Sequence, residues 1–422
     1  MLTLQKIREE KEEIIKGLKK RNLSVENTIN QILKLDEERR SAQHELDSIL
    51  NNIKTLSKEI GQLYAQGKGE EAEQKKTETQ NNKETSKRMQ EKMQNAESQI
   101  QALLIEIPNV PHEDVKAGKS AEENEIIKDQ KDLPVLPEWA KPHWEIMENL
   151  DIMDMAAGTK ITGAGFPLYK GKGAKLQRSL IQFFLDKATD AGYLEVIPPL
   201  LINEASAYAT GQLPDKEGQM YEIQTEKFFL IPTAEVPITN LYRDALVDPK
   251  ELPVKLVGYT PCFRREAGSY GKDVRGLNRV HQFDKVEIVQ IQKPENSYKA
   301  LKEMIDYVES LLTELNIPYR IVRLCGGDMG FTAAMTYDFE IYAAGQKRWL
   351  EVSSVSNFES FQSNRLKLRY KEEGKTKLLH TLNGSALALA RLMAVIIENN
   401  QTQDGVNIPE VLKPYTKFDS IT

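Results

Sequence analysis

Apolar residues recur at heptad spacing through the first hundred residues of the chain. Between Ile32 and Leu63, one series of positions repeats every seven residues and a second series follows it by three, as in an a/d seam. Arg39 is the one polar residue that interrupts the seam. Gly67-Lys68-Gly69 then breaks the pattern, and a weaker seam runs from Ala72 to Leu103. These features predict two long helices joined by a tight turn.

Two structures are compatible with this pattern: a coiled coil that dimerises with another chain, and an antiparallel hairpin that closes on itself. The Gly-Lys-Gly turn favours the hairpin, because it lets the two seams pair within one chain. A helix from Glu26 to Gln66 would be roughly 60 Å long. A further short amphipathic helix before the hairpin is predicted by Leu4, Ile7, Ile14, Ile15 and Leu18.

From about Trp139 onward, short β-rich runs alternate with helical segments. The predicted helices cover residues 173–191, 297–315 and 386–399. The predicted strands cover residues 194–202, 228–231, 254–260, 280–291, 319–324, 336–342 and 348–355. Many of these strands follow one another without a helix between them, which favours an antiparallel sheet flanked by helices, the α+β class. We therefore expect a helical arm at residues 1–108 and a second domain at residues 109–422.

Composition and charge narrow the function classes. No apolar run approaches the roughly 20 residues of a membrane span, and charges interrupt the N-terminus where a signal peptide would be apolar. A cytoplasmic protein without a membrane partner is expected. Two cysteines and five scattered histidines do not suit a zinc site, so any metal is expected to be Mg²⁺ that arrives with a phosphate ligand. The net charge of −6 argues against non-specific coating of nucleic acid, but not against a local patch for structured RNA.

The segment from Cys262 to Val289 concentrates candidate catalytic side chains. Two predicted strands flank a loop that carries Gly268, Gly271 and Gly276, together with Arg264, Arg265, Lys272, Arg275 and Arg279. Strand alternation places Arg264 and Glu266 on one face of the first strand. It also places a second set on one face of the second strand: His281, Phe283, Lys285 and Glu287. Arginine suits phosphate or carboxylate, and an aromatic ring can stack on a base. A surface hairpin held by salt bridges is the alternative interpretation.

Three further segments add candidate ligands. Thr233 and Glu235 are expected on one strand face, where a buried pair would suit a small zwitterion. Glu351-Val-Ser-Ser354 is expected to end a strand and to offer oxygen ligands for magnesium, ribose or phosphate. Asn383-Gly-Ser385 is expected to begin a helix that buries Arg391 among apolar residues. A buried, unpaired arginine is costly, so Arg391 needs an anionic partner.

Taken together, these segments resemble the signature motifs of class II aminoacyl-tRNA synthetases, and specifically those of the bacterial-type seryl-tRNA synthetase family. The second motif is matched by Phe263–Gly268 with Arg279–Glu287, and the third by Asn383–Arg391. The first, the dimer motif, is matched by Gly192-Tyr193 with Pro198-Pro199, and the seryl branch by Thr210–Pro214 and Pro232–Glu235. The resemblance covers the whole chain. Small departures, such as Cys325-Gly-Gly-Asp328 where the family usually has Cys-Thr-Gly-Asp, remove no motif residue.

The resemblance implies ATP- and Mg²⁺-dependent activation of L-serine to seryl-adenylate, followed by transfer of serine to tRNA(Ser), within a homodimer. Whether tRNA(Sec) is also charged stays open. It implies catalytic roles for Arg264 and Arg391, with Mg²⁺ held by Glu351 and Ser354. ATP binding is implied for Arg264, Arg265, Glu266, Val280, Phe283, Glu351, Val352, Ser353, Ser354 and Arg391. Serine binding is implied for Thr233, Ala234, Glu235, Arg264, Glu287 and Ser385.

In this family the N-terminal hairpin reaches the long variable stem of serine tRNA, so residues 1–108 are expected to bind tRNA and residues 109–422 to catalyse aminoacylation. Because the acidic and basic residues of the hairpin balance, RNA contacts are expected from a few positions: Arg39, Arg40, Lys54, Lys75 and Lys76. Two other functions are compatible with parts of the sequence. A synthetase-like paralogue that charges a carrier protein would lack the hairpin, and a non-enzymatic coiled-coil protein would not need the matched pocket residues.

Overall fold

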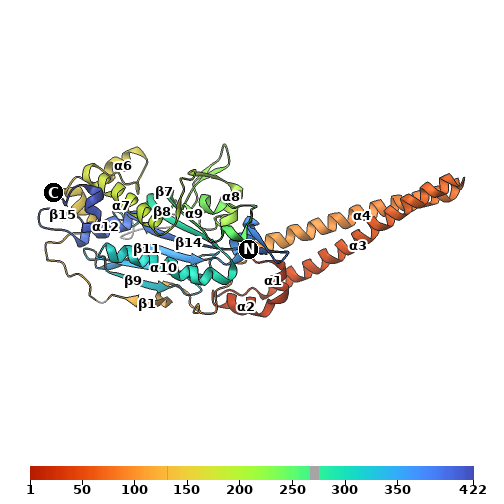
Figure 1. Cartoon of the computed structure of the whole chain (residues 1–422), viewed down its shortest axis with the longest axis horizontal. Helices are drawn as coiled ribbons and strands as arrows, with labels where there is room; N and C mark the ends of the chain where they lie inside the picture. Colours follow the sequence, from red (N-terminus) through yellow and green to blue (C-terminus); the bar gives the residue numbers. More distant parts are fainter. Residues whose placement is uncertain (131, 267–274) are drawn as a thin grey trace. The chain divides into compact units, whose positions relative to one another are not determined.

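The computed structural model describes residues 1–130, 132–266 and 275–422. The chain divides into two compact units (Figure 1). The first, called the arm below, comprises Met1–Lys19 and Leu23–Pro108. The second, called the sheet domain below, comprises Lys20–Asn22 and Asn109–Thr422.

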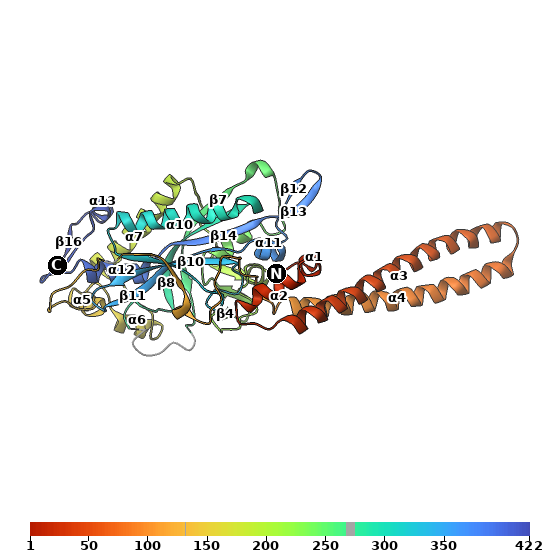
Figure 2. The same ribbon diagram turned by 90° about the horizontal axis from the view of Figure 1, so that it is seen from below.

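The arm is helical, and its two long helices form the predicted antiparallel hairpin (Figure 2). Its helices are α1 (Leu4–Glu9), α2 (Lys11–Lys19), α3 (Glu26–Ala65) and α4 (Gly69–Leu104). Gly67 turns the chain between the long helices with a φ of +73°, a conformation that glycine adopts without strain. The buried seam includes Ile32, Leu35, Ala42, Leu46 and Leu56 from α3, and Ala72, Met89, Ala96 and Ile100 from α4. The single short helix predicted before the hairpin is two helices, α1 and α2.

An eight-stranded sheet forms the centre of the sheet domain, with the strand order β1-β9-β10-β11-β14-β8-β7-β2. All neighbouring pairs are antiparallel except β2 with β7. The strands are β1 (Glu125–Asp129), β2 (Leu194–Glu195), β7 (Val254–Phe263), β8 (Gln282–Gln292), β9 (Tyr319–Arg323), β10 (Met335–Ala343), β11 (Arg348–Asn357) and β14 (His380–Ala388). The predicted α+β class is confirmed.

Three amphipathic helices cover one face of this sheet: α7 (Gly171–Asp190), α10 (Ser297–Glu314) and α12 (Leu389–Asn399). Strand β8 shows how the two faces differ. Val286 and Ile288 lie in the core beneath the helices. Phe283 and Lys285 alternate with them and line a cavity on the other face. The helices thus leave one face of the sheet free for a ligand.

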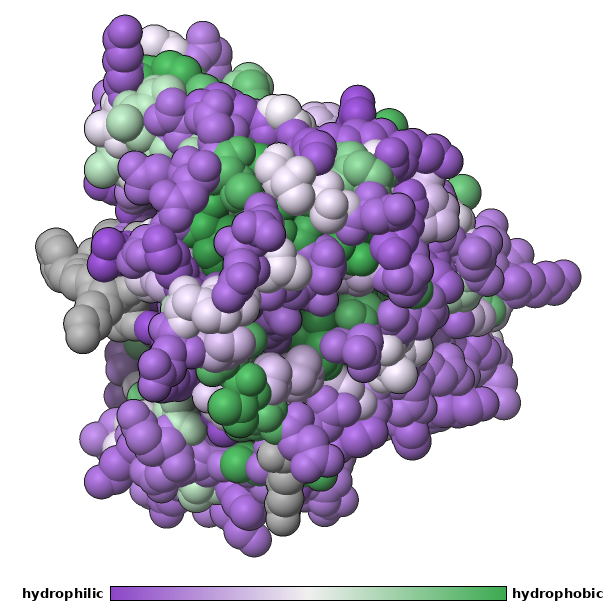
Figure 3. All heavy atoms as spheres, turned by 90° about the vertical axis from the view of Figure 1, so that its left-hand side faces the viewer, coloured by the Kyte–Doolittle hydropathy of each residue, from purple (hydrophilic) through white to green (hydrophobic). Residues whose placement is uncertain are grey.

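Smaller elements surround the central sheet. The helices among them are α5 (His143–Asn149), α6 (Met155–Ile161), α8 (Glu204–Thr210), α9 (Glu235–Asn240), α11 (Ser360–Leu366) and α13 (Lys413–Thr416). The strands are β3 (Leu201–Asn203), β4 (Glu222–Ile223), β5 (Phe228–Leu230), β6 (Leu246–Val247), β12 (Arg369–Glu372), β13 (Lys375–Leu378), β15 (Val406–Asn407) and β16 (Ser420–Ile421). The face drawn in Figure 3 is mostly hydrophilic, with hydrophobic side chains gathered near its centre. Among the described residues, no helix is long and apolar enough to cross a membrane.

Three segments adopt a different local structure from the one predicted. The segment Thr233–Glu235 is a turn into α9 rather than a strand, because the Thr233 hydroxyl accepts a hydrogen bond from the Glu235 N–H at 3.2 Å. Asn383–Ser385 lies in strand β14, since these residues pair with β8 and β11, and helix α12 begins only at Leu389. Glu351 to Ser354 lies inside β11 rather than at its end, because β11 continues its pairing with β10 to Asn357.

Candidate active site

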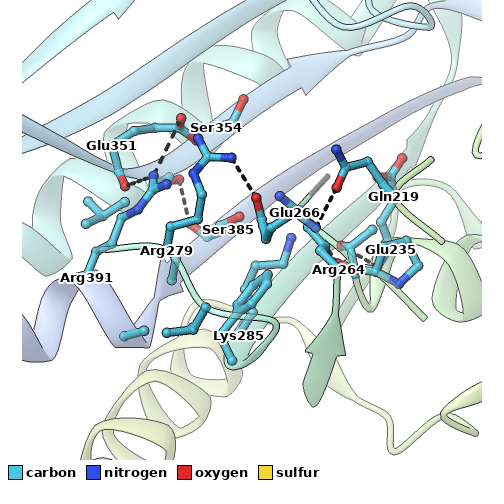
Figure 4. A pocket seen from close by; sticks show the side chains of 18 of the residues that line it. Gln219, Glu235, Arg264, Glu266, Arg279, Lys285, Glu351, Ser354, Ser385 and Arg391 are labelled. Carbon is cyan, nitrogen blue, oxygen red and sulfur yellow. Dashed lines mark hydrogen bonds and ion pairs between the residues drawn. The ribbon is translucent and has the colours of Figure 1, made fainter. Parts of the chain in front are cut away.

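A cavity of about 440 Å³ opens on the sheet face opposite α7, α10 and α12. This volume is in the usual range for a small-ligand site. Strands β8, β11 and β14, the ends of β7 and α12, and the turn before α9 supply its walls (Figure 4). Twelve of the expected site residues line it: Thr233, Glu235, Arg264, Glu266, Val280, Phe283, Glu351, Val352, Ser353, Ser354, Ser385 and Arg391.

Arg264 lies just beyond the end of β7, next to the ring of Phe283 on β8. Its guanidinium carbon is 5.2 Å from the ring centroid, and its Nε donates to the carbonyl of Pro232 at 3.3 Å. The backbone N–H of Arg264 donates to the carbonyl of His281 at 2.9 Å, which continues the pairing of the two strands. A cation is thus held against an aromatic face, inside the cavity and ready for an anion.

Glu266 is held by two partners on either side of the cavity. Its carboxylate accepts a hydrogen bond from Arg279 at 2.6 Å, and its backbone N–H donates to the side-chain oxygen of Gln219 at 3.1 Å. The backbone of Glu266 has a φ of +48°, which is unusual for a residue with a side chain. Gln219 was not predicted from the sequence, although it follows the Thr210–Pro214 segment by only a few residues. The structure shows that it braces this strained backbone.

Arg391, on the first turn of α12, spans the opposite wall. Its Nε donates to the carbonyl of Asn278 and its Nη1 to the carbonyl of Glu351, both at 2.8 Å. The Glu351 carboxylate lies 3.8 Å from Nη1, which supplies the anionic partner that the sequence required. Burial lowers the pKa of Arg391, and the charge of Glu351 opposes that effect. The guanidinium is therefore fixed in direction before any ligand binds.

Two buried carboxylates, Glu235 and Glu287, share one end of the site. The Asn383 side-chain amide donates to both, at 3.0 Å to Glu235 and 2.9 Å to Glu287. Lys285 pairs with Glu287 at 2.6 Å, and Gln362 donates to Glu235 at 2.7 Å. Burial, followed by the nearby charge of Glu287, raises the pKa of Glu235 to about 7. Lys285 balances the charge of one of the two carboxylates, so the other can bind an additional cation.

The predicted magnesium ligands fit the oxygen chemistry of that ion. Glu351 and Ser354 both line the cavity, and Asp338 pairs with Ser354 across β10 and β11. One carboxyl oxygen of Asp338 is buried without a hydrogen-bond partner among the described residues. Burial and the charge of Glu351 raise the pKa of Asp338 well above its usual value. Within the described part of the chain, no group of three His, Cys, Asp or Glu side chains is placed to hold a metal ion.

Three expected site residues do not line the cavity. Ala234 is fully buried, and Arg265 is exposed, with its backbone N–H donating to the carbonyl of Gln219 at 2.9 Å. Glu287 is fully buried behind the wall and reaches the site through Lys285 and Asn383.

Three other residues of the predicted loop lie outside the described residues: Gly268, Gly271 and Lys272. Besides Gln219, the sequence did not single out Gln362, because nothing in its local pattern marks a residue that contacts Glu235 from another element.

Comparisons with known proteins agree with this geometry. Residues 220–400 match the tRNA synthetase class II core domain (G, H, P, S and T), and residues 1–111 match the seryl-tRNA synthetase N-terminal domain. The serine–tRNA ligase of Salinibacter ruber is 46% identical, over 100% of this chain and 99% of that protein.

Solved structures agree as well. The seryl-tRNA synthetase of Pyrococcus horikoshii, complexed with ATP, has a TM-score of 0.94 and 33% identity over 100% of this chain and 99% of its own. The cytoplasmic serine–tRNA ligase of Naegleria fowleri, in complex with AMP, has a TM-score of 0.89 and 27% identity over the same shares. The arm matches a domain specific to seryl-tRNA synthetases, the core matches the class II domain, and one relative is 46% identical over the whole chain. The chain therefore belongs to the seryl-tRNA synthetase family.

Proposed function

We propose that the chain activates L-serine with ATP and then transfers the serine to the 3′ end of tRNA(Ser). The observation that carries this proposal is the single cavity with two chemically different ends. One end has Phe283 and Arg391, which suit a nucleotide, and the other has the carboxylate of Glu235, with Glu287 buried behind the wall, which suits an amino acid.

At the nucleotide end, Phe283 is placed to stack on adenine and Glu266 to accept from the adenine amino group. The ion pair with Arg279 and the contact with Gln219 support this role, since both fix Glu266. Arg391 covers the other side of the base and reaches the γ-phosphate. Val280, Val352 and Ser353 complete the wall.

At the amino-acid end, we assign the serine ammonium to Glu235 and the serine hydroxyl to Ser385, whose own hydroxyl donates to Glu287 behind the wall at 3.4 Å. The charges support this division, because Lys285 neutralises Glu287 while Glu235 is held by neutral amides. A site built to pair a hydroxyl discriminates strongly against alanine, whose binding leaves buried polar groups unpaired. Thr233 lies beside Glu235 and adds a hydroxyl at the same end.

In the first step, a serine carboxylate oxygen attacks the α-phosphorus of ATP, and the bond to the β-phosphate breaks to release pyrophosphate. Arg264 lies between the two ends of the cavity, where it can hold the serine carboxylate and the α-phosphate together. Proton transfer is minor in this step, so positioning and charge stabilisation carry the catalysis. Glu351 and Ser354 would hold Mg²⁺, which when bound neutralises charge on the phosphates.

In the second step, a ribose hydroxyl at the 3′ end of tRNA attacks the seryl carbonyl, and AMP leaves. We assign tRNA binding to the arm, residues 1–108, and catalysis to residues 109–422. The long paired helices support this role, because α3 and α4 pack mainly on each other and contribute none of the residues that line the cavity. A two-helix element is also suited to reading the shape of a stem.

We further infer a homodimer formed through the edge of the sheet near β2. Large apolar side chains are exposed there, with Ile197 at 88% and Leu194 at 66%. Such side chains on an edge strand are a liability unless another chain covers them. Sedimentation of a monomer at micromolar concentration would contradict this inference.

Two assays in sequence test the proposed function. The first measures ATP–pyrophosphate exchange with serine, and with alanine and threonine as controls. The second measures charging of tRNA(Ser), with a tRNA(Sec) transcript in parallel to settle that substrate. Serine-dependent exchange without charging of either tRNA would contradict the assignment of the acceptor. Absence of serine-dependent exchange would contradict the whole proposal.

A further inference from the structure

Three polar side chains meet in the core of the sheet domain, beyond the nucleotide end of the cavity and apart from the residues assigned above. They are His143 at the start of α5, Gln346 in the turn between β10 and β11, and Glu398 near the end of α12. His143 and Glu398 are both fully buried. Helices α5 and α12 contact each other and lie at the same end of the sheet domain (Figure 2). These three residues are called the buried triad below.

Glu398 is the acceptor at the centre of the buried triad. Four N–H groups donate to its carboxylate: the backbone of His143 at 3.0 Å, Nδ1 of His143 at 2.8 Å, the backbone of Gln346 at 3.1 Å and the side chain of Gln346 at 2.8 Å. A buried carboxylate is tolerated only when donors satisfy it, and a fully satisfied buried network is rigid. The triad therefore joins α5, α12 and the β10–β11 turn into one fixed unit.

The imidazole of His143 connects this unit to the cavity wall. The backbone N–H of Leu277 donates to Nε2 of His143 at 2.9 Å. Because Nε2 accepts this bond, it carries no proton, and Nδ1 is the nitrogen that donates to Glu398. His143 thus serves as a bridge between a buried carboxylate and the backbone of a residue that lines the cavity.

Gln346 makes the second connection to the same segment. Its side-chain oxygen accepts from the amide of Asn278 at 2.8 Å, while its nitrogen donates to Glu398. The carbonyl of Asn278 in turn accepts from Nε of Arg391 at 2.8 Å. Leu277 and Asn278 are therefore held from behind by two members of the triad, and Asn278 directs the guanidinium of Arg391.

Two glycines show how closely the backbone fits around the buried triad. Gly276 has a φ of +63°, and a Cβ at that position would lie 2.3 Å from Nε2 of His143. A Cβ at Gly345 would lie 2.9 Å from a carboxyl oxygen of Glu398. Real Cβ atoms do not approach other atoms this closely, so any side chain at either position would displace the triad or the backbone that it holds.

Helix α12 connects the buried triad to Arg391. Arg391 lies in its first turn and Glu398 in its last, about 10 Å apart along the helix at about 1.5 Å per residue. Both ends of the helix are thus tied to the same dipeptide, Leu277–Asn278, one directly and one through the triad. Two independent connections therefore fix the position of Arg391 relative to that dipeptide: its own bond to Asn278, and the triad at the other end of α12.

We propose that His143 and Gln346 are positioning residues for ATP: they hold Leu277 and Asn278, so that the Asn278 carbonyl keeps the Arg391 guanidinium aimed into the cavity. This inference rests on the proposed function of the cavity. The triad touches no part of the amino-acid end, where Glu235 and Glu287 have other partners. Loss of the triad should therefore weaken ATP binding and leave serine binding unchanged.

The test compares His143→Phe and Gln346→Met, which keep approximate volume and remove the two connections, with Gln401→Ala. Gln401 is the matched control, because it joins Lys141 to the end of α12 at the same junction but does not contact Leu277 or Asn278. Dissociation constants for ATP are measured by calorimetry, and KM values for ATP and serine by pyrophosphate exchange. A misplaced guanidinium should raise both ATP constants by about tenfold in each test variant. The KM for serine and all constants of Gln401→Ala should stay near wild type.

An unchanged ATP dissociation constant in a folded test variant overturns the positioning role. Equal rises in the KM values for ATP and serine also overturn it, because they indicate a general loss of packing. If His143→Phe does not fold, the half-buried Gln346 decides through Gln346→Met. Wild-type activity in the same assay tests the proposed function separately, so the two failures are distinguishable.

Discussion

Charged side chains in the arm pair mostly at the surface, whereas those in the sheet domain that line or back the cavity pair in the interior. In the arm, Lys76 pairs with Glu73, three residues away on the same helix, and both side chains are at least half exposed. In the sheet domain, Lys285 and Glu287 form an ion pair with almost no exposure. Exposed pairs add little to stability, while breaking a buried pair leaves an uncompensated charge. The surface charges of the arm are therefore available for a partner, and those of the cavity are committed to one geometry.

Asp36 is the exception in the arm. Its side chain is 1% exposed, with Arg8 at 2.6 Å and Arg39 at 2.9 Å. Burial works against ionisation, yet hydrogen bonds from Arg8 and Arg39 hold the pKa of Asp36 below its usual value. Arg39, the polar interruption of the heptad seam, is thus engaged inside the arm. Its predicted RNA contact would have to compete with this pair.

Removal of the arm should separate the roles of the arm and the sheet domain with the largest effect. Replacement of residues 27–104 by a short Gly/Ser linker should lower tRNA charging by orders of magnitude, because it removes the two long helices to which tRNA binding is assigned. Pyrophosphate exchange should stay near normal, since every residue that lines the cavity lies beyond residue 210. Measuring both activities on one preparation makes the check. Parallel loss of the two would mean that the arm is structural.

The next largest effect is expected at Arg264. Arg264→Ala should lower pyrophosphate exchange by about 10²–10³-fold, the usual cost of one preorganised donor at a developing charge. The neighbouring Arg265→Ala serves as a matched comparison, because its side chain is exposed and outside the cavity wall. Its effect should be much smaller. Similar losses in both variants would restore the expectation that Arg265 binds ATP through its side chain.

A pH profile sharpens the comparison at the amino-acid end. The pKa of Glu235 is raised to about 7, and the serine ammonium needs its ionised form. The KM for serine in exchange assays should therefore fall by about tenfold between pH 6 and pH 8. Glu235→Gln should bind serine weakly and show a flat profile. A wild-type profile as flat as that of the variant would contradict the assignment of Glu235 to the ammonium.

The same group makes a prediction for stability. The pKa of Glu235 is higher in the folded state than its ordinary value of 4.5, so the folded state binds more protons between about pH 4.5 and pH 7. Stability should therefore fall as pH rises through this window, by about 3 kcal/mol for this group. The Glu235→Gln variant lacks this loss. Comparing the unfolding of both proteins across the window, without serine, measures the difference.

The smallest effects are expected from single basic positions of the arm. Arg40 and Lys54 are exposed, and neither forms an ion pair within the described part of the chain. Lys75 and Lys76 are each paired with glutamates. Joint substitution of Arg40 and Lys54 by alanine should raise the tRNA KM by about three- to tenfold and reduce its salt dependence. The corresponding change at Lys75 and Lys76 should have a smaller effect, and the reverse order would contradict the argument from pairing.

The arm could be predicted almost completely from the sequence, because a heptad seam is a local, repeated signal. Its turn and both long helices lie within a few residues of the prediction. The sheet domain was predicted less well where tertiary pairing decides the local structure. Asn383–Ser385 becomes a strand only because β8 and β11 lie on either side of it.

In the site, too, local sequence patterns could be interpreted, whereas contacts between distant segments could not. Residues within the recognised motifs, such as Arg264 and Glu266, could be placed together from their pattern and the resemblance. Side chains that support them from other elements could not, because their partners are distant in sequence. Gln362 is 127 residues from Glu235, and His143 is 134 residues from Leu277. No periodicity or spacing connects such pairs before the chain has folded.

The unequal charge count at the amino-acid end has a consequence for inhibitor chemistry. With both carboxylates ionised and Lys285 paired with Glu287, Glu235 has no ion-pair partner among the described residues. An adenylate mimic that keeps a primary amine supplies the missing positive charge, whereas one that replaces the amine with hydrogen forces a buried carboxylate to stay without a counter-ion or to take up a proton. The amine is thus the group that a designed analogue should retain first, ahead of the hydroxyl that distinguishes serine from alanine.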